Sequence, residues 1–195
     1  AMAIEGSEYK AVVDRATGAV KDIVKRPSLE SNKLIEEFMI LANVAAASAL
    51  ASKNAPCVYR VHDKPVSADR IEDLRGYLST LGIALPAGQG DEPDFFNTAL
   101  AAAAKTPYAA IVQDAVLRVQ AKAFYRMDNT GHFGLALEKY AHFTSPFRRY
   151  ADLLVHRSLV EHFNMGAGGL DKAQGANLSK MAEHISNTEL ASTNA

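Results

Sequence analysis

Apolar residues recur along most of this chain at helical spacing, after two short runs near the start that suit β-strands. Residues 8–14 and 19–25 are these two runs, and Gly18 between them gives the backbone freedom that a short hairpin loop needs. Residues 32–52 then predict a long helix, with Ser31 as its N-cap. The apolar positions that recur in this helix are Leu34, Ile35, Phe38, Met39, Leu41, Ala42, Ala45 and Ala49.

The middle of the chain predicts one short strand followed by three helices. Residues 57–61 contain β-branched and aromatic side chains and predict a buried strand. Ser67 is placed to cap the next helix and Gly82 to end it. Asp94 is expected to cap a short helix that runs to about residue 104, and residues 106–124 predict a further helix.

The last third of the chain predicts a strand, two helices and a glycine-rich break between them. Residues 132–137 alternate apolar and other residues and predict a strand. Ser145 as N-cap and Pro146 at the first helical position predict a helix that runs to about residue 163. After the break, a last helix is expected to begin near Asn177. The elements together predict a helix-rich α+β fold with a small mixed or antiparallel sheet.

Composition narrows the class of protein. Of the 195 residues 48% are hydrophobic and the formal net charge is −1, a balance that excludes an intrinsically disordered chain. Since no apolar run approaches about 18 residues without a charge, we expect no membrane span. Cys57 is the only cysteine, which excludes a disulfide scaffold. Together with the lack of a signal-peptide pattern at the start, this favours a cytoplasmic protein.

Charge is distributed unevenly, which changes what the near-neutral total implies. Residues 118–157 contain seven Lys and Arg against three Asp and Glu, a net +4, so the remainder of the chain sums to −5. A locally basic segment points to an anionic partner. A solvated basic face balanced by a neighbouring acidic one is the simpler interpretation, and charge alone favours it.

Arg148 and Arg149 are the most informative residues of that segment. Both are expected in the first turn of the helix after Pro146, where the helix dipole disfavours a cation by about 0.3–1 kcal/mol. One explanation is an anion shared between a guanidinium group and the free backbone N–H groups, as in phosphate binding. The other is a salt bridge, because Asp152 lies four residues after Arg148 and three after Arg149. Such a bridge explains one arginine but does not easily explain both.

The long helix over residues 32–52 carries a second candidate. Glu36 and Glu37 lie near its N-terminus, where the helix dipole favours acidic side chains without any functional reason. Glu36 and Asn43 are seven residues apart and therefore share one face of the helix. The alanine-rich stretch that follows allows a partner to approach closely, so this stripe is a candidate lining of a ligand groove.

Several aromatic rings accompany the arginines. A ring beside a cation suits single-stranded nucleic acid, because bases stack and phosphates pair, whereas core packing is the better explanation for most of these rings. The rings are Phe124, Tyr125, Phe133, Tyr140, Phe143, Phe147 and Tyr150. The nearby histidines lack the spacing of zinc ligands, so we expect no metal site in this chain.

Residues 132–157, HFGLALEKYAHFTSPFRRYADLLVHR, resemble the signature of the RNB family, the ribonuclease II and ribonuclease R exoribonucleases. Residues 34–43, LIEEFMILAN, and residues 56–65, PCVYRVHDKP, are similar to two further blocks of that family in the same order. The resemblance covers most of the chain. It implies a processive 3′-to-5′ hydrolase of single-stranded RNA that releases nucleoside 5′-monophosphates and uses Mg²⁺ held by four aspartates.

The resemblance also implies roles for individual residues. Arg148 matches the arginine that contacts the scissile phosphate and stabilises developing negative charge, which makes it the candidate catalytic residue. Glu36 matches the glutamate near the 3′-terminal ribose, with its neighbour Glu37 as the alternative. The other residues assigned to substrate binding, as channel-lining or supporting side chains, are Asn43, Tyr140, Ser145 and Arg149.

The chain departs from the family in one respect, because it contains no Asp-x-Asp-Asp constellation. In the family the aspartate cluster precedes the matched region, and cold-shock and S1 domains flank it. We therefore expect residues 1–195 to be the C-terminal part of an RNB catalytic domain, with the Mg²⁺ ligands outside this chain. This part is expected to be inactive by itself and to expose apolar surface that promotes self-association. Two alternatives stay open: a non-catalytic RNA-binding or scaffold module, such as a degenerate paralogue, and a helical interaction domain without a nucleic-acid role.

Overall fold

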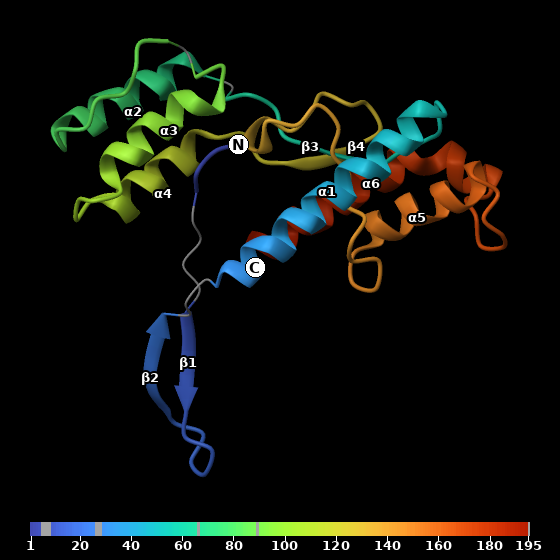
Figure 1. Ribbon diagram of the computed structural model, residues 1–195, viewed down its shortest axis with the longest axis horizontal. Coiled ribbons are helices and arrows are strands. Elements are labelled where there is room, and N and C mark those ends of the chain that lie inside the picture. Colours follow the sequence, from blue (N-terminus) through green and yellow to red (C-terminus); the bar gives the residue numbers. More distant parts are fainter. Residues whose placement is uncertain (5–8, 26–28, 66, 89, 195) are drawn as a thin grey trace.

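The computed structural model describes residues 1–195 except 5–8, 26–28, 66, 89 and 195, and its elements form three groups (Figure 1). A hairpin comprises β1 (Tyr9–Val13) and β2 (Val20–Lys25). A helical cluster comprises α2 (Ala68–Thr80), α3 (Pro93–Ala103) and α4 (Ala109–Val119). The third group places a two-stranded sheet among three helices: β3 (Tyr59–Val61), β4 (Phe124–Arg126), α1 (Glu30–Ser52), α5 (Tyr150–His162) and α6 (Lys172–Asn194). This is the α+β class that the sequence predicts.

The first two strands form the predicted hairpin. β1 pairs antiparallel with β2, and the register shifts between Val12 and Val13. Gly18 lies in the loop at a φ of +72°, a left-handed conformation that glycine adopts at little cost. The described side chains of both strands are exposed, so the hairpin adds no buried side chain to the core.

Helices α2, α3 and α4 enclose a hydrophobic core of their own. Ser67 caps α2 as predicted, since its side chain accepts a hydrogen bond from the backbone N–H of Arg70. The predicted cap at Asp94 is wrong: α3 begins at Pro93 with Glu92 as its N-cap, because proline favours the first helical position. The buried residues of this core are Ile71, Leu74, Leu78, Ile83, Leu85, Phe96, Ala99, Leu100, Ala103, Val112, Val116 and Phe133.

Strands β3 and β4 form the antiparallel sheet that lies nearest the candidate site. The prediction of a buried strand within residues 57–61 is confirmed, whereas the helix predicted to reach residue 124 is wrong, since α4 ends at Val119. The outer edge of β4 is closed by α6: the Ser186 hydroxyl accepts from the Tyr125 backbone N–H at 2.8 Å and lies 3.3 Å from the Tyr125 carbonyl oxygen. The paired residues are Tyr59 with Arg126, Arg60 with Tyr125 and Val61 with Phe124.

Residues 132–137 do not form the predicted strand. Residues Phe133–Leu135 make a single 3₁₀ turn, η1, and His132 and Leu137 form only an isolated β-bridge across it. Gly131 and Ala136, with φ angles of +83° and +53°, turn the backbone on either side. The alternating apolar pattern therefore belongs to a tight turn, which buries Phe133 in the helical cluster.

Helix α1 has two halves with different surroundings. It begins at Glu30 with Leu29 as its N-cap, so the predicted cap at Ser31 is wrong. Residues 31–39 are exposed on every side, and the predicted apolar stripe from Leu34 to Leu41 therefore faces solvent in this chain. The second half is the packed one, through Asn43, Ala46, Ala47 and Leu50.

The length and composition of α1 also fit a membrane-crossing helix. Its mean hydropathy reaches 1.6 over an 18-residue window, although the charges along the sequence predict no membrane span. A core helix of a soluble protein meets the same criteria, so this observation is weak evidence for a membrane.

Helix α5 begins five residues after the predicted cap. Residues 146–148 form a turn and Arg149 is extended at the N-cap, with φ −123° and ψ 118°. The prediction that Ser145 and Pro146 start the helix is therefore wrong. Helix α6 begins at Lys172, five residues before the predicted start at Asn177.

Candidate functional site

The candidate site is built around residues 143–149, here called the arginine loop, which lead into α5. The Ser145 carbonyl oxygen accepts from the backbone N–H groups of Arg148 at 3.2 Å and Arg149 at 3.1 Å, which closes the turn. Both arginines therefore precede the helix, whereas the sequence placed them in its first turn. Three buried or half-buried side chains from α1 and α5 hold this loop in place.

Asn43 of α1 is the first of these supports. Its Nδ2 donates to the Tyr140 hydroxyl at 2.9 Å, and its Oδ1 accepts from the backbone N–H groups of Phe143 at 2.8 Å and Thr144 at 3.3 Å. The side chain is only 3% exposed. The predicted groove-lining role of Asn43 is wrong in this chain, because its polar atoms bind protein groups in the interior. Tyr140 is buried with it.

Asp152 of α5 is the second support and settles which arginine is paired. Its carboxylate accepts from the Ser145 backbone N–H at 2.8 Å and from Arg149 Nε and Nη2 at 2.8 and 2.9 Å. Asp152 is fully buried, and the Arg149 side chain is 26% exposed. The predicted salt bridge therefore goes to Arg149, three residues before Asp152. Ser145, also buried, shapes the turn through its backbone.

His156 of α5 is the third support. Its Nε2 donates to the Phe143 carbonyl oxygen at 2.8 Å, and its ring stacks on the Phe143 ring with centroids 4.2 Å apart. Among the described residues, the hydrogen bonds from these three supports reach the loop at Phe143, Thr144, Ser145 and Arg149. They do not reach its tip, residues 146–148. Arg148 is exposed and has no ion-pair partner among the residues that the structure describes.

A chain of aromatic and histidine rings lies behind the loop. Successive ring centroids from His62 through His132, Tyr140 and His142 to Tyr125 are 5.1–5.7 Å apart. The Tyr125 hydroxyl lies 2.8 Å from His142 Nδ1. Burial lowers the pKa of His142 to about 4, and the positive charges of Arg149 and Arg60 act in the same direction.

Burial also lowers the pKa of His132 to about 4, with His62 and Arg60 acting in the same direction. The Tyr125 pKa is raised, chiefly by burial. His132, His142 and Tyr125 are therefore uncharged near neutral pH, and they stabilise the site by packing and hydrogen bonding.

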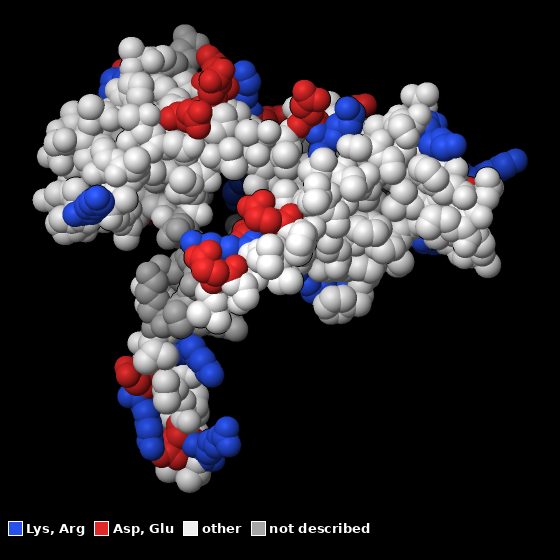
Figure 2. All heavy atoms as spheres, in the orientation of Figure 1, with Lys and Arg blue, Asp and Glu red and all other residues white. Residues whose placement is uncertain are grey.

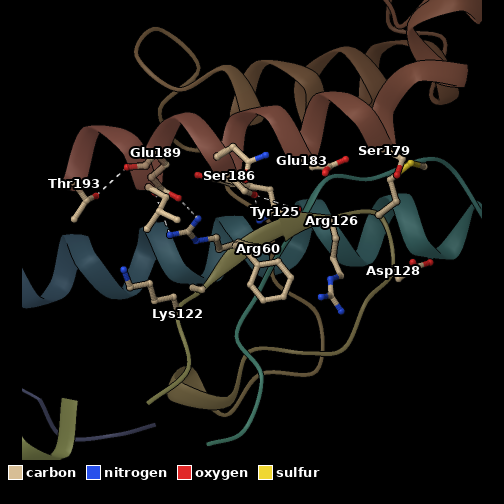
Figure 3. Close-up of a pocket in the computed structure, with 15 residues that line it drawn as sticks. Arg60, Lys122, Tyr125, Arg126, Asp128, Ser179, Glu183, Ser186, Glu189 and Thr193 are labelled. Carbon is tan, nitrogen blue, oxygen red and sulfur yellow. Dashed lines mark hydrogen bonds and ion pairs between the residues drawn. The ribbon is translucent and has the colours of Figure 1, made fainter. Parts of the chain in front are cut away.

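An ion pair that the sequence analysis did not identify fixes α6 over the sheet. Arg60 of β3 binds both carboxylate oxygens of Glu189, with Nη1–Oε2 at 2.6 Å and Nη2–Oε1 at 3.1 Å (Figure 3). The Arg60 guanidinium also lies 4.5 Å from the centroid of the Tyr125 ring. A cavity of about 730 Å³ between β4 and α6 adjoins this pair. Because the partners are 129 positions apart in the sequence, no local sequence pattern indicates the contact.

The basic segment 118–157 does not form one basic surface on the visible face of the molecule. Lys and Arg are scattered there among Asp and Glu, with wide uncharged areas between them (Figure 2). Arg118 and Arg126 have acidic neighbours in Asp114 and Asp63. The simpler interpretation of the charge pattern fits this face, and it does not account for the exposed Arg148.

Glu36 and Glu37 lie on the exposed half of α1. In the part of the chain that the structure describes, neither carboxylate has a hydrogen-bond or ion-pair partner, and neither is brought into contact with Arg148. Their proximity to a ribose stays a prediction. Likewise, the described residues contain no group of three or more His, Cys, Asp or Glu side chains that fits a metal ion, and the location of the Mg²⁺ ligands stays a prediction.

The chain is similar to known proteins over most of its length. The family model described as RNB domain matches residues 1–164. Ribonuclease R of Escherichia coli strain K12 is 42% identical over 153 residues, which cover 78% of this chain and 19% of that protein. The chain thus spans about a fifth of the length of the curated relatives that it matches first.

Solved structures show the same similarity in three dimensions. Mycoplasma genitalium RNase R, in complex with ribose-methylated single-stranded RNA, matches with a TM-score of 0.87 at 28% identity, over 99% of this chain and 30% of that chain. Yeast Ssd1, described as a pseudonuclease, matches with a TM-score of 0.64 at 22% identity, over 79% of this chain and 19% of that chain. The second likeness shows the fold alone.

Proposed function

Since the chain belongs to the RNB domain family, we propose that it forms part of a processive 3′-to-5′ exoribonuclease that hydrolyses single-stranded RNA to nucleoside 5′-monophosphates. In this proposal residues 1–195 are the C-terminal part of the catalytic domain. Arg148 contacts the scissile phosphate and stabilises the negative charge that develops on it. Glu36, or its neighbour Glu37, lies near the 3′-terminal ribose.

The observation that carries the proposal is the contrast between two adjacent arginines. Arg149 is bound on its guanidinium group by a buried carboxylate, whereas Arg148 is exposed on the same held loop with no described ion-pair partner. An unpaired cation on a held backbone turn binds an anion without first breaking another interaction. Because the turn is held by Asn43, Asp152 and His156, little backbone conformational entropy is lost when a phosphate binds.

The substrate class rests on similarity as well as on chemistry. The Mycoplasma relative is described in complex with single-stranded RNA. A guanidinium group suits a phosphodiester because its planar fork of donors matches two phosphate oxygens. Asn43, Tyr140, Ser145 and Arg149 serve this site by positioning the loop that carries Arg148.

The proposed enzyme uses Mg²⁺ bound by residues outside this chain, since the described residues do not fit a metal site. The chain alone is expected to be inactive, to bind RNA weakly and to self-associate through its exposed apolar surface, and the whole protein is expected in the cytoplasm.

The experiment that tests the proposal compares Arg148→Ala with Arg70→Ala in the full-length protein proposed to contain this chain. Arg70 is also exposed and unpaired among the described residues, but it lies on α2. Decay of single-stranded RNA in Mg²⁺ should fall about 10²-fold or more for Arg148→Ala and little for Arg70→Ala. A loss of less than about threefold for Arg148→Ala would contradict the assigned role.

The isolated chain provides a second test. Purified residues 1–195, freed of contaminating nucleases, should not degrade polyadenylate in Mg²⁺. Hydrolysis by this preparation that is abolished by Arg148→Ala would contradict the proposed division of the active site between this chain and the rest of the protein.

A non-catalytic RNA-binding module is the second candidate function. The likeness to Ssd1 indicates that this fold also occurs in a protein described as a pseudonuclease. The coding sequence upstream of Ala1 separates the two candidates: an intact aspartate cluster there supports the nuclease and its loss supports the binding module. RNA binding that is absent, or independent of salt, would instead favour a helical interaction domain.

A further inference from the structure

The structure separates the aromatic rings near the arginine loop into packed rings and two exposed rings, Tyr150, which is 47% exposed, and Phe147. Phe133 and Tyr140 are buried, Phe143 stacks on His156, and Phe124 lies under the guanidinium of Arg126 at 4.2 Å. Phe147 differs from all of them, because 86% of it is exposed, the highest fraction among the described large hydrophobic residues. The folded chain gains almost nothing from this ring, since an apolar side chain stabilises a fold by leaving water.

Phe147 also occupies a particular place in the loop. It immediately precedes Arg148 and lies in the turn closed by the Ser145 carbonyl oxygen. The three supports hold the loop on both sides of Phe147, at Phe143, Ser145 and Arg149. A single-stranded nucleotide presents a base face, which stacks on an aromatic ring, and a phosphate, which pairs with a cation. The exposed ring and the exposed guanidinium group on adjacent residues provide a partner for each.

We propose that Phe147 is a base-stacking residue of the substrate channel, and that its ring packs against a base next to the phosphate bound by Arg148. This inference rests on the proposed function and adds a second substrate contact to it. Because every base has a π-face, the contact is expected to tolerate any sequence. It would hold the strand while the terminal phosphodiester is positioned beside Arg148.

A spectroscopic experiment on residues 1–195 tests the contact directly. The chain contains no tryptophan, so Phe147→Trp introduces a single indole at the loop, which can be excited selectively over the 7 tyrosines. Phe163→Trp introduces one at the far end of α5 as a matched control. Saturating oligoadenylate should quench the first variant and leave the second nearly unchanged. An abasic oligonucleotide with the same number of phosphates should not quench either. Equal quenching by both oligonucleotides, or none by bound oligoadenylate, would overturn the inference.

A kinetic experiment on the full-length protein separates base stacking from packing against another part of the protein. Phe147→Ala should raise the KM for single-stranded RNA at least about fivefold, with a smaller change in kcat. Phe147→Tyr should restore the KM, whereas Phe147→Leu should not, because leucine retains the apolar contact but not the flat ring. Rescue by leucine equal to that by tyrosine would show that the ring packs against protein.

The two proposals fail in different ways. If Arg148→Ala leaves RNA decay unchanged, the proposed function fails and the stacking contact fails with it. If Arg148→Ala abolishes decay while Phe147→Ala leaves the KM unchanged, the proposed function stands and the inference about Phe147 is refuted.

Discussion

Replacing Asp152 by alanine tests whether buried hydrogen bonds hold the arginine loop. The substitution removes the acceptor for three donors: the Ser145 backbone N–H and two guanidinium nitrogens of Arg149. It leaves a cation with reduced access to water and a backbone N–H without its partner. The loop should loosen, so Asp152→Ala should lower both the stability of the chain and the ability of Arg148 to act on RNA.

The magnitude follows from the burial of the two partners. Breaking a fully buried ion pair costs about 3–5 kcal/mol. Arg149 is 26% exposed, so water replaces part of the lost interaction and the cost falls toward the lower end of that range. The unpaired Ser145 N–H adds to the cost. We expect a loss of about 3 kcal/mol, which at a urea m-value of about 2 kcal/mol/M lowers the unfolding midpoint by about 1.5 M.

The chain offers a matched control in Asp114 and Arg118, which form the same kind of pair at 2.9 Å with exposures of 61% and 78%. Asp114→Ala should change the free energy of unfolding by less than about 1 kcal/mol, because water screens an exposed pair. Urea unfolding followed by circular dichroism measures both variants. Equal losses for Asp152→Ala and Asp114→Ala would refute the reasoning, since burial would then have no effect. Asp152→Asn, which keeps an oxygen acceptor but loses the charge, should fall between the wild type and Asp152→Ala.

Two further predictions concern the rings and the turn behind the loop. The folded-state pKa values of His132 and His142, about 4, lie below the ordinary 6.5, so the unfolded chain binds more protons between these values. Their contribution to stability is complete above about pH 6.5 and is lost as the pH falls toward 4, on the order of 3 kcal/mol for each ring. The free energy of unfolding of His142→Gln should therefore fall less between pH 7 and pH 4.5 than that of the wild type. An unchanged loss would count against a buried neutral ring. Gly134→Ala should destabilise the chain, because the new Cβ would lie 2.8 Å from Nδ1 of His62. In contrast, a Cβ at Gly76 in α2 meets no atom within 4 Å, so Gly76→Ala should stabilise the chain by up to about 1 kcal/mol. Thermal melts that rank the two variants in the opposite order would contradict the described packing.

Local sequence rules predicted those elements whose ends are fixed by local interactions. The hairpin around Gly18 and the cap of α2 at Ser67 are examples, since each depends on residues within a few positions of one another. The start of α5 was missed because the Ser145 backbone N–H is bound by Asp152, seven residues away. Residues 132–137 were missed because a tight turn closed by Gly131 and Ala136 gives the same alternation as a strand.

The candidate site was predictable in part for the same reason. Spacing allowed Asp152 to pair with either arginine, and only the extended backbone at Arg149 decides between them. The apolar periodicity of α1 predicts the helix correctly, but periodicity does not indicate whether its apolar face is covered by another element. The contact between Arg60 and Glu189 depends on how α6 returns to the sheet, which no local pattern indicates.

Helix α1 also sets a fixed length within the site. Glu36 and Asn43 are separated by two helical turns, or about 10 Å along the axis, and an α-helix does not stretch appreciably. One end of this spacer bears the carboxylates assigned to the sugar, while the other is anchored beneath the turn that carries the guanidinium. A single residue inserted between them would rotate the acidic end by about 100° and lengthen the spacer by about 1.5 Å. In the proposed site, the register of this helix would therefore set the distance between the sugar end of a bound strand and its phosphate.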